Sequence, residues 1–205
     1  MIKDRYCFLI FPLIFILTRI QYIDNIYNLA SYLIFIIMNY IISMIFFRIL
    51  KKMTDVNLKK IIVWIAGLIV LDQLLKIIVY RFDINMNILG KLLRIKQTKN
   101  LEQMAALNFL NIKMDGSVII IFKILLIFIV LGVFFMIKYK NRNVIAGFIL
   151  LMSAAIVTLI DSVFWGYTLD FICFDKLTCY DMKDFYVDIA IGFIFMEQFK
   201  KEEKK

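Results

Sequence analysis

The chain has 205 residues, of which 63% are hydrophobic, and its formal net charge is +9. This apolar share lies far above the roughly 45–50% of a soluble domain, and the mean hydropathy is +0.85, so composition excludes an ordinary soluble protein. The chain contains no histidine, which excludes Ser-His-Asp and Cys-His catalysis. Much of the positive charge stands at the ends of apolar segments. This pattern favours orientation in a membrane over binding to nucleic acid.

Six apolar segments come near the length of about 20 residues that a helix needs to cross a bilayer. They cover residues 6–20, 26–47, 61–80, 118–137, 144–160 and 185–199. No small-residue cleavage site follows the first segment, so we expect it to remain a membrane helix rather than a signal peptide. Basic clusters after the second and fourth segments and at the C-terminus predict that both termini are cytoplasmic. The expected fold is an all-α polytopic membrane protein.

Two parts of the scaffold carry further predictions. Residues 81–117 form a long polar loop, and a loop of this length is usually structured or functional. Residues 92–97 alternate between apolar and polar and predict a short strand, and residues 101–109 predict a short helix on the membrane surface. We expect this β-strand and helix element on the extracytoplasmic side. Lys123, alone among apolar residues of the fourth segment, is expected to snorkel to the interface.

Two acidic residues stand at the facing ends of the last two apolar segments, Asp161 and Asp188. A charge at the centre of a membrane helix costs about 2.5–3.5 kcal/mol, so such residues indicate a site. Two adjacent carboxyl groups share a proton; one then takes a proton from water while the other polarises a carbonyl, as in aspartic proteases. The alternative is that Asp161 only ends a helix at the interface and Asp188 only occupies a first turn, where the helix dipole favours it.

Two other pairs leave alternatives open. Asp72 and Lys76 share one face of the third segment, either as a pair that neutralises itself near the interface or as a polar face turned into the bundle. Cys173 and Cys179 lie in the same predicted external loop and fit no metal spacing. They are either a disulfide or two free thiols.

Four stretches, taken in order, resemble motifs of signal peptidase II, the lipoprotein signal peptidase. LDQLLK at 71–76 looks like its aspartate-glutamine-x-x-lysine motif, and LID at 159–161 sits at its first catalytic aspartate. GYTLDFI at 166–172 looks like its glycine-tyrosine-x-x-aspartate-phenylalanine-isoleucine element. DFYVD at 184–188 sits where its phenylalanine-asparagine-x-alanine-aspartate motif ends in the second catalytic aspartate. The resemblance covers residues 60–199.

The resemblance implies an intramembrane aspartyl endopeptidase that cleaves prolipoproteins before a diacylglyceryl-modified cysteine, without a metal or cofactor. Asp161 and Asp188 would be the catalytic dyad. The residues implied to support it or to bind substrate are Asp72, Gln73, Lys76, Asn100, Gly166 and Asp170. The implied partners are a lipidated signal peptide and membrane lipid, and the implied location is a bacterial inner membrane with the site on the extracytoplasmic side. Residues 60–205 would form the catalytic domain, and residues 1–59 would add a pair of helices.

The chain departs from the family pattern at three motif positions. Thr158 and Ser162 stand where the family has an asparagine and an arginine beside the first aspartate, and Phe185 stands at the asparagine of the second motif. Two other functions therefore stay open. One is a catalytically silent homologue that binds lipidated or hydrophobic peptides. The other is an unrelated membrane transport accessory protein whose acids serve ion movement.

Overall fold

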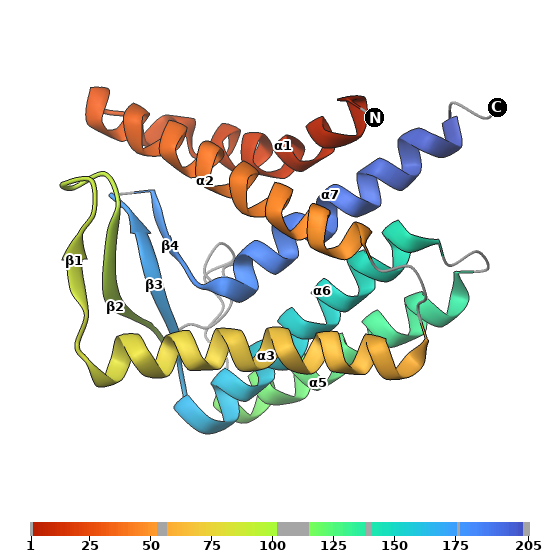
Figure 1. Cartoon of the computed structure of the whole chain (residues 1–205). Coiled ribbons are helices and arrows are strands. Elements are labelled where there is room, and N and C mark those ends of the chain that lie inside the picture. The colour runs from red at the N-terminus through yellow and green to blue at the C-terminus, as the bar shows by residue number, and fades with distance from the viewer. Residues whose placement is uncertain (1, 53–56, 102–114, 138–140, 176, 203–205) are drawn as a thin grey trace.

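The computed structural model describes residues 2–52, 57–101, 115–137, 141–175 and 177–202. Six long helices are found in these ranges, as the apolar segments predict (Figure 1). They are α1 Ile2–Leu17, α2 Ile26–Lys51, α3 Leu58–Arg81, α5 Gly116–Met136, α6 Arg142–Ile160 and α7 Met182–Glu202. Helices α2, α3, α5 and α6 are long and apolar enough to cross a membrane. The chain is therefore a polytopic membrane protein, as expected.

Polar residues set where the helices begin. Asn25, Asn57, Asp115 and Asn141 each precede a helix, and each side chain accepts a hydrogen bond from a backbone N–H of the first turn. Such N-caps satisfy donors that the helix leaves without partners. Polar residues in the loops thus determine where these four helices begin.

A four-stranded antiparallel sheet lies at one end of the helices, beyond the C-terminal end of α3 (Figure 1). Its strands follow in chain order: β1 Asn85–Asn87, β2 Arg94–Asn100, β3 Thr168–Phe174 and β4 Thr178–Tyr180. Strand β2 confirms the strand predicted at residues 92–97. Strands β3 and β4, between α6 and α7, were not predicted. The surface helix expected at 101–109 lies outside the described residues, apart from its first residue.

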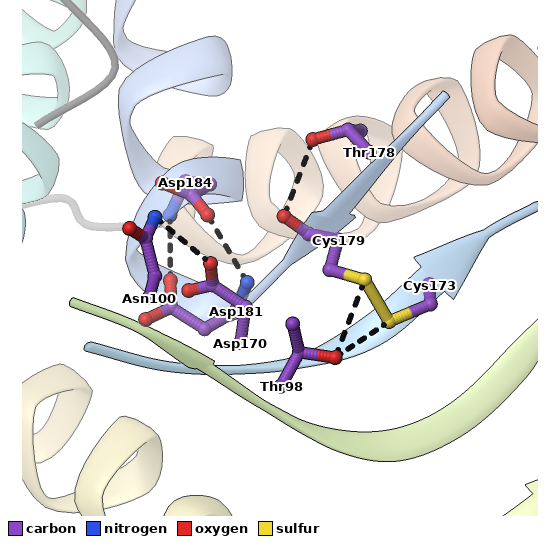
Figure 2. Close-up of a disulfide and its surroundings, with 8 residues drawn as sticks. All are labelled: Thr98, Asn100, Asp170, Cys173, Thr178, Cys179, Asp181 and Asp184. Atoms are coloured by element: carbon purple, nitrogen blue, oxygen red, sulfur yellow. Dashed lines mark hydrogen bonds between the residues drawn. A yellow bond between two sulfur atoms is a disulfide. The ribbon is translucent and has the colours of Figure 1, made fainter. Parts of the chain in front are cut away.

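A disulfide joins Cys173 of β3 to Cys179 of β4, which are also direct cross-strand partners. The Thr98 hydroxyl of β2 lies 3.4 Å from one sulfur and 3.5 Å from the other (Figure 2). The two thiols that the sequence left open are therefore paired. The bond closes the β3–β4 hairpin immediately before α7 begins.

Helix α7 packs against α1, α2 and α6. Phe8 of α1 is buried and makes edge-to-face contacts with Phe47 of α2 and Phe193 of α7. A Cβ atom added at Gly192 would lie 2.3 Å from the Phe8 ring, so α1 reaches α7 only because that position has no side chain. The N-terminal helical pair is thus packed directly on the helix that bears the predicted second aspartate.

Candidate active site

The end of α6 carries Asp161 into the interior. The helix continues into a π-helical turn, Asp161–Trp165, and Gly166 ends it in the left-handed conformation with φ of 71°. Glycine adopts this conformation without a steric penalty, and it turns the chain into β3. Asp161 is fully buried in this turn. π-Helical turns are frequent at functional sites.

Both carboxylate oxygens of Asp161 accept hydrogen bonds from α3. Gln73 donates its amide to Oδ1 at 3.1 Å, and Lys76 lies 2.7 Å from Oδ2. The indole N–H of Trp165, which can only donate, lies 3.1 Å from the Gln73 carbonyl oxygen. That bond fixes the orientation of the Gln73 amide, so its N–H₂ group faces Asp161. The donors of α3 therefore fix the direction of the Asp161 carboxylate.

Lys76 joins the acids of three elements. Its Nζ lies 2.8 Å from Asp72 and 2.7 Å from both Asp161 and Asp181, and all four side chains are fully buried. The polar face of α3 is thus turned into the bundle. Asp72 also accepts a hydrogen bond from the backbone N–H of Lys183 at 3.2 Å, which ties α3 to the start of α7.

The start of α7 adds two carboxylates. Asp181 precedes the helix, and its Oδ1 accepts from the Asp184 N–H at 3.2 Å, while Asp184 Oδ2 accepts from the Asp181 N–H at 3.1 Å. This is the reciprocal geometry of a capping box, which satisfies backbone N–H groups that the helix leaves without partners. Asp181 Oδ2 is further paired with Lys76 and Lys183. Asp184 is only partly buried.

Asp170 of β3 completes the cluster (Figure 2). Carboxylate oxygens of Asp170, Asp181 and Asp184 lie within 4.8 Å of one another, and Asn100 donates to Asp170 at 3.4 Å. Burial raises the pKa of Asp170 to about 7, with Asp181 adding to the shift and Lys183 opposing it. Among the described residues, these three acids lie close enough together to share a metal cation. The ammonium of Lys183 is already there, because its Nζ contacts Asp181 and lies 3.9 Å from Asp170.

The cluster holds more carboxylates than cations. Its acids are Asp72, Asp161, Asp170, Asp181 and Asp184, and the ammonium groups in contact with them belong to Lys76 and Lys183. Crowded carboxylates cannot all ionise, so they share protons. The arrangement can therefore supply an ionised carboxylate and a protonated one side by side, which is the chemistry expected of an aspartyl dyad.

Asp188, the expected second member of the dyad, has other partners. Its carboxylate accepts hydrogen bonds from Asn39 of α2 and from the Tyr180 hydroxyl. These are the hydrogen-bond partners of Asp188 within the described residues, whereas those of Asp161 are Gln73 and Lys76. Asp188 lies one helical turn beyond Asp184 and, among the described contacts, is not joined to the cluster around Lys76, so its catalytic role stays a prediction.

The sequence held a signal for Asp184. The family's phenylalanine-asparagine-x-alanine-aspartate motif also fits YDMKD at 180–184, with an aromatic residue first and an aspartate last. In DFYVD at 184–188 the first position is an aspartate instead. The motif therefore has a second possible register, which ends at Asp184, one helical turn before Asp188.

Lys123 does not snorkel as expected. Its side chain is fully buried, and Nζ donates to the Thr158 carbonyl oxygen at 3.1 Å and to the Ser162 hydroxyl. The end of α6 offers these acceptors inside the bundle, so the lysine points inward rather than to the membrane surface.

Comparison with known proteins adds three findings. Residues 64–200 match the protein-family model described as "Signal peptidase (SPase) II". Two solved structures, titled bacterial membrane enzyme structures by the in meso method at 2.3 and 1.9 Å, share the fold. The first has a TM-score of 0.58 at 21% identity and covers 72% of this chain and 92% of its own. The second has a TM-score of 0.57 at 19% identity and covers 70% and 94%. No curated protein matches the chain.

Proposed function

The chain belongs to the signal peptidase II family, and from that premise we propose that it is an aspartyl endopeptidase that cleaves diacylglyceryl-modified prolipoproteins. Membership supports a membrane hydrolase with a role in processing lipoprotein signal peptides. The finer proposal concerns the residues that perform the reaction, the substrate and the orientation in the membrane.

One observation carries the proposal: a buried carboxylate at the end of α6 shares a lysine with the capping residue of α7. Asp161 Oδ2 and Asp181 Oδ2 both lie 2.7 Å from Lys76 Nζ, so these two oxygens are separated by at most twice that distance. Asp184 is bonded to Asp181 and stands in the same cluster. A water molecule and a scissile carbonyl bound between the ends of α6 and α7 would meet both acids.

The contacts favour different tasks for these acids. Asp161 receives donors on both oxygens, which fix the direction of its carboxylate at the end of α6, and it would accept the proton of the attacking water. Asp181 caps the first turn of α7 and is paired with both Lys76 and Lys183, so we assign it a structural task. Burial raises the pKa of Asp184 well above its ordinary range, with the carboxylates of Asp181 and Asp170 adding to the shift and Lys183 opposing it, so Asp184 would carry the proton that polarises the scissile carbonyl. We therefore propose Asp161 and Asp184 as the dyad.

The surroundings suit a lipidated peptide. Val163 and Phe164, within three residues of Asp161, are 53% and 80% exposed, and they offer apolar surface beside the acids. A diacylglyceryl group that reaches the site through the bilayer would contact such surface. We place the site on the extracytoplasmic side of a bacterial inner membrane, with both termini cytoplasmic. The family match begins at residue 64, which supports residues 1–59 as an addition to a catalytic domain at 60–205.

A silent homologue that binds lipidated peptides is the second candidate. It is favoured by Thr158 and Ser162, which replace the asparagine and arginine that the family has beside the first aspartate. Such a protein would hold the substrate without cutting it.

The test is cleavage of a diacylglyceryl-modified prolipoprotein by the purified chain in detergent, beside Asp161→Asn. Asp175→Asn, in the β3–β4 turn outside the cluster, is the matched control, since asparagine also tolerates the positive φ of that position. We expect the parent and the control to cleave and Asp161→Asn to be inactive. Binding without cleavage by the parent would favour the silent homologue. If the parent neither binds nor cleaves the precursor, both candidate functions on this substrate are wrong.

A further inference from the structure

A buried lysine on α5 has no task in the proposed reaction. Helix α5 is the most apolar of the candidate membrane spans, and Ile119 and Lys123 are its buried residues. The other residues of α5 are at least partly exposed on the surface of the bundle. A buried ammonium needs hydrogen-bond acceptors. The acceptors of Lys123 on α6 therefore indicate the role of this side chain.

The two acceptors flank Asp161. Lys123 Nζ donates to the Thr158 carbonyl oxygen, three residues before Asp161, and to the Ser162 hydroxyl, the residue after it. The same carbonyl oxygen accepts the backbone N–H of Asp161 and lies 3.2 Å from the Ser162 hydroxyl. One carbonyl therefore gathers several donors at the point where α6 changes from α- to π-helical geometry. The Lys123 ammonium therefore stabilises this turn from the side of α5.

The ammonium also acts on the cluster through space. Lys123 is in electrostatic range of Asp161, Lys76 and Lys183. Asp161 thus has a cation on the α5 side as well as on the α3 and α7 sides. Ser162 occupies the place of the family's arginine, and a neighbouring helix brings a cation to the same turn.

We propose that Lys123 is a positioning residue that fixes the turn bearing Asp161 and supplies the cation that residue 162 lacks. This inference rests on the proposed function. The turn, rather than the binding of the peptide, depends on Lys123, so its loss lowers kcat and leaves KM unchanged.

The test compares Lys123→Met, Lys123→Arg and the double variant Lys123→Met with Ser162→Arg, using the same lipidated substrate. Lys123→Met is expected to lower kcat about 10- to 100-fold, the range typical of small misplacements of a reacting group, with KM within about twofold. Lys123→Arg is expected to keep most of the activity. The double variant should recover at least about tenfold of the loss, because a guanidinium at position 162 returns the charge to the turn. Lys60→Met, exposed on α3, is the control.

Two outcomes would overturn the inference while leaving the proposed function in place: a parent-like kcat for Lys123→Met, or equal losses in all three variants with no recovery by arginine. Thermal unfolding of each purified variant identifies any that fail to fold. If Lys123→Met is among these, Ser162→Ala, which removes one acceptor and keeps the lysine, is expected to lower kcat several-fold, and parent-like activity would overturn the inference. Absence of cleavage by the parent is a failure of the proposed function instead.

Discussion

Asp181 and Asp184 hold each other at the start of α7, where the backbone N–H of each donates to the side chain of the other at 3.1 and 3.2 Å. Figure 2 shows the pair beside Asp170 and Asn100. The exchange fixes both carboxylates on one helical turn. Because Asp181 also shares Lys76 with Asp161, the geometry of Asp184 relative to Asp161 is set by buried contacts rather than by a flexible loop.

The first prediction separates the two candidates for the second catalytic acid. Asp184→Asn is expected to lower the cleavage rate by about 10²- to 10⁴-fold, the usual contribution of a general acid or base. Asp188→Asn is expected to stay within a few-fold of the parent, because an amide can still accept from Tyr180 while its neighbour Asn39 reorients. Initial rates with the lipidated precursor decide between them. An inactive but folded Asp188→Asn, beside an active Asp184→Asn, would restore Asp188 as the partner of Asp161.

The second prediction concerns the lysine that joins the cluster. Lys76→Met leaves Asp72, Asp161 and Asp181 in the interior without their shared cation. Removal of one partner of a buried ion pair costs about 3–5 kcal/mol, so we expect a large fall in the thermal unfolding temperature. Lys60→Met on the exposed part of the same helix is the control and should unfold like the parent. Equal unfolding temperatures for the two variants would contradict the account of Lys76.

Hydropathy and loop composition were sufficient to predict the six helices and strand β2. Strand β3 was missed because six of its seven residues, including Asp170, are buried, so the sequence TLDFICF does not alternate between apolar and polar. Strand β4 has three residues and depends on pairing with β3. Their existence follows from tertiary contacts, which a single sequence does not display.

The candidate site was predicted in part. The Asp72, Gln73, Lys76 and Asp161 group follows from helical spacing and from the order of the motifs. The second acid stays a prediction, because the motif fits the chain in two registers one turn apart, which end at Asp184 and at Asp188. The direction of Lys123 also could not be predicted, since snorkelling or burial depends on whether a neighbouring helix offers acceptors at the same depth.

The third prediction follows from the pKa of Asp170, which burial raises to about 7 from an ordinary 3.8. Between these values the folded chain keeps a proton that the unfolded chain releases, so this contribution to stability is complete below about pH 4 and is lost as the pH rises through 7. Asp170→Asn stays neutral throughout. We expect the parent's unfolding temperature to fall more steeply than the variant's between pH 4 and 8, by the equivalent of a few kcal/mol. Parallel curves would contradict the raised pKa.

The last prediction tests the contact between the N-terminal helices and α7. Gly192→Ala places a Cβ atom 2.3 Å from the ring of Phe8, which is 1% exposed and held between Phe47 and Phe193. A confined ring cannot move aside, so we expect a loss of about 1–3 kcal/mol, typical of overpacking.

Gly132→Ala in α5 is the matched control for this change, because nothing lies within 4 Å of its added Cβ. Alanine is favoured over glycine inside a helix by about 1 kcal/mol, so this control should unfold at or above the parent's temperature. Thermal unfolding in the same detergent gives both values. Because Gly192 lies two turns beyond Asp184 on α7, the folded fraction of Gly192→Ala should retain cleavage. If Gly192→Ala is as stable as Gly132→Ala, then α1 is free to shift on α7, and the N-terminal pair is not fixed to the catalytic helix as the Phe8 contact indicates.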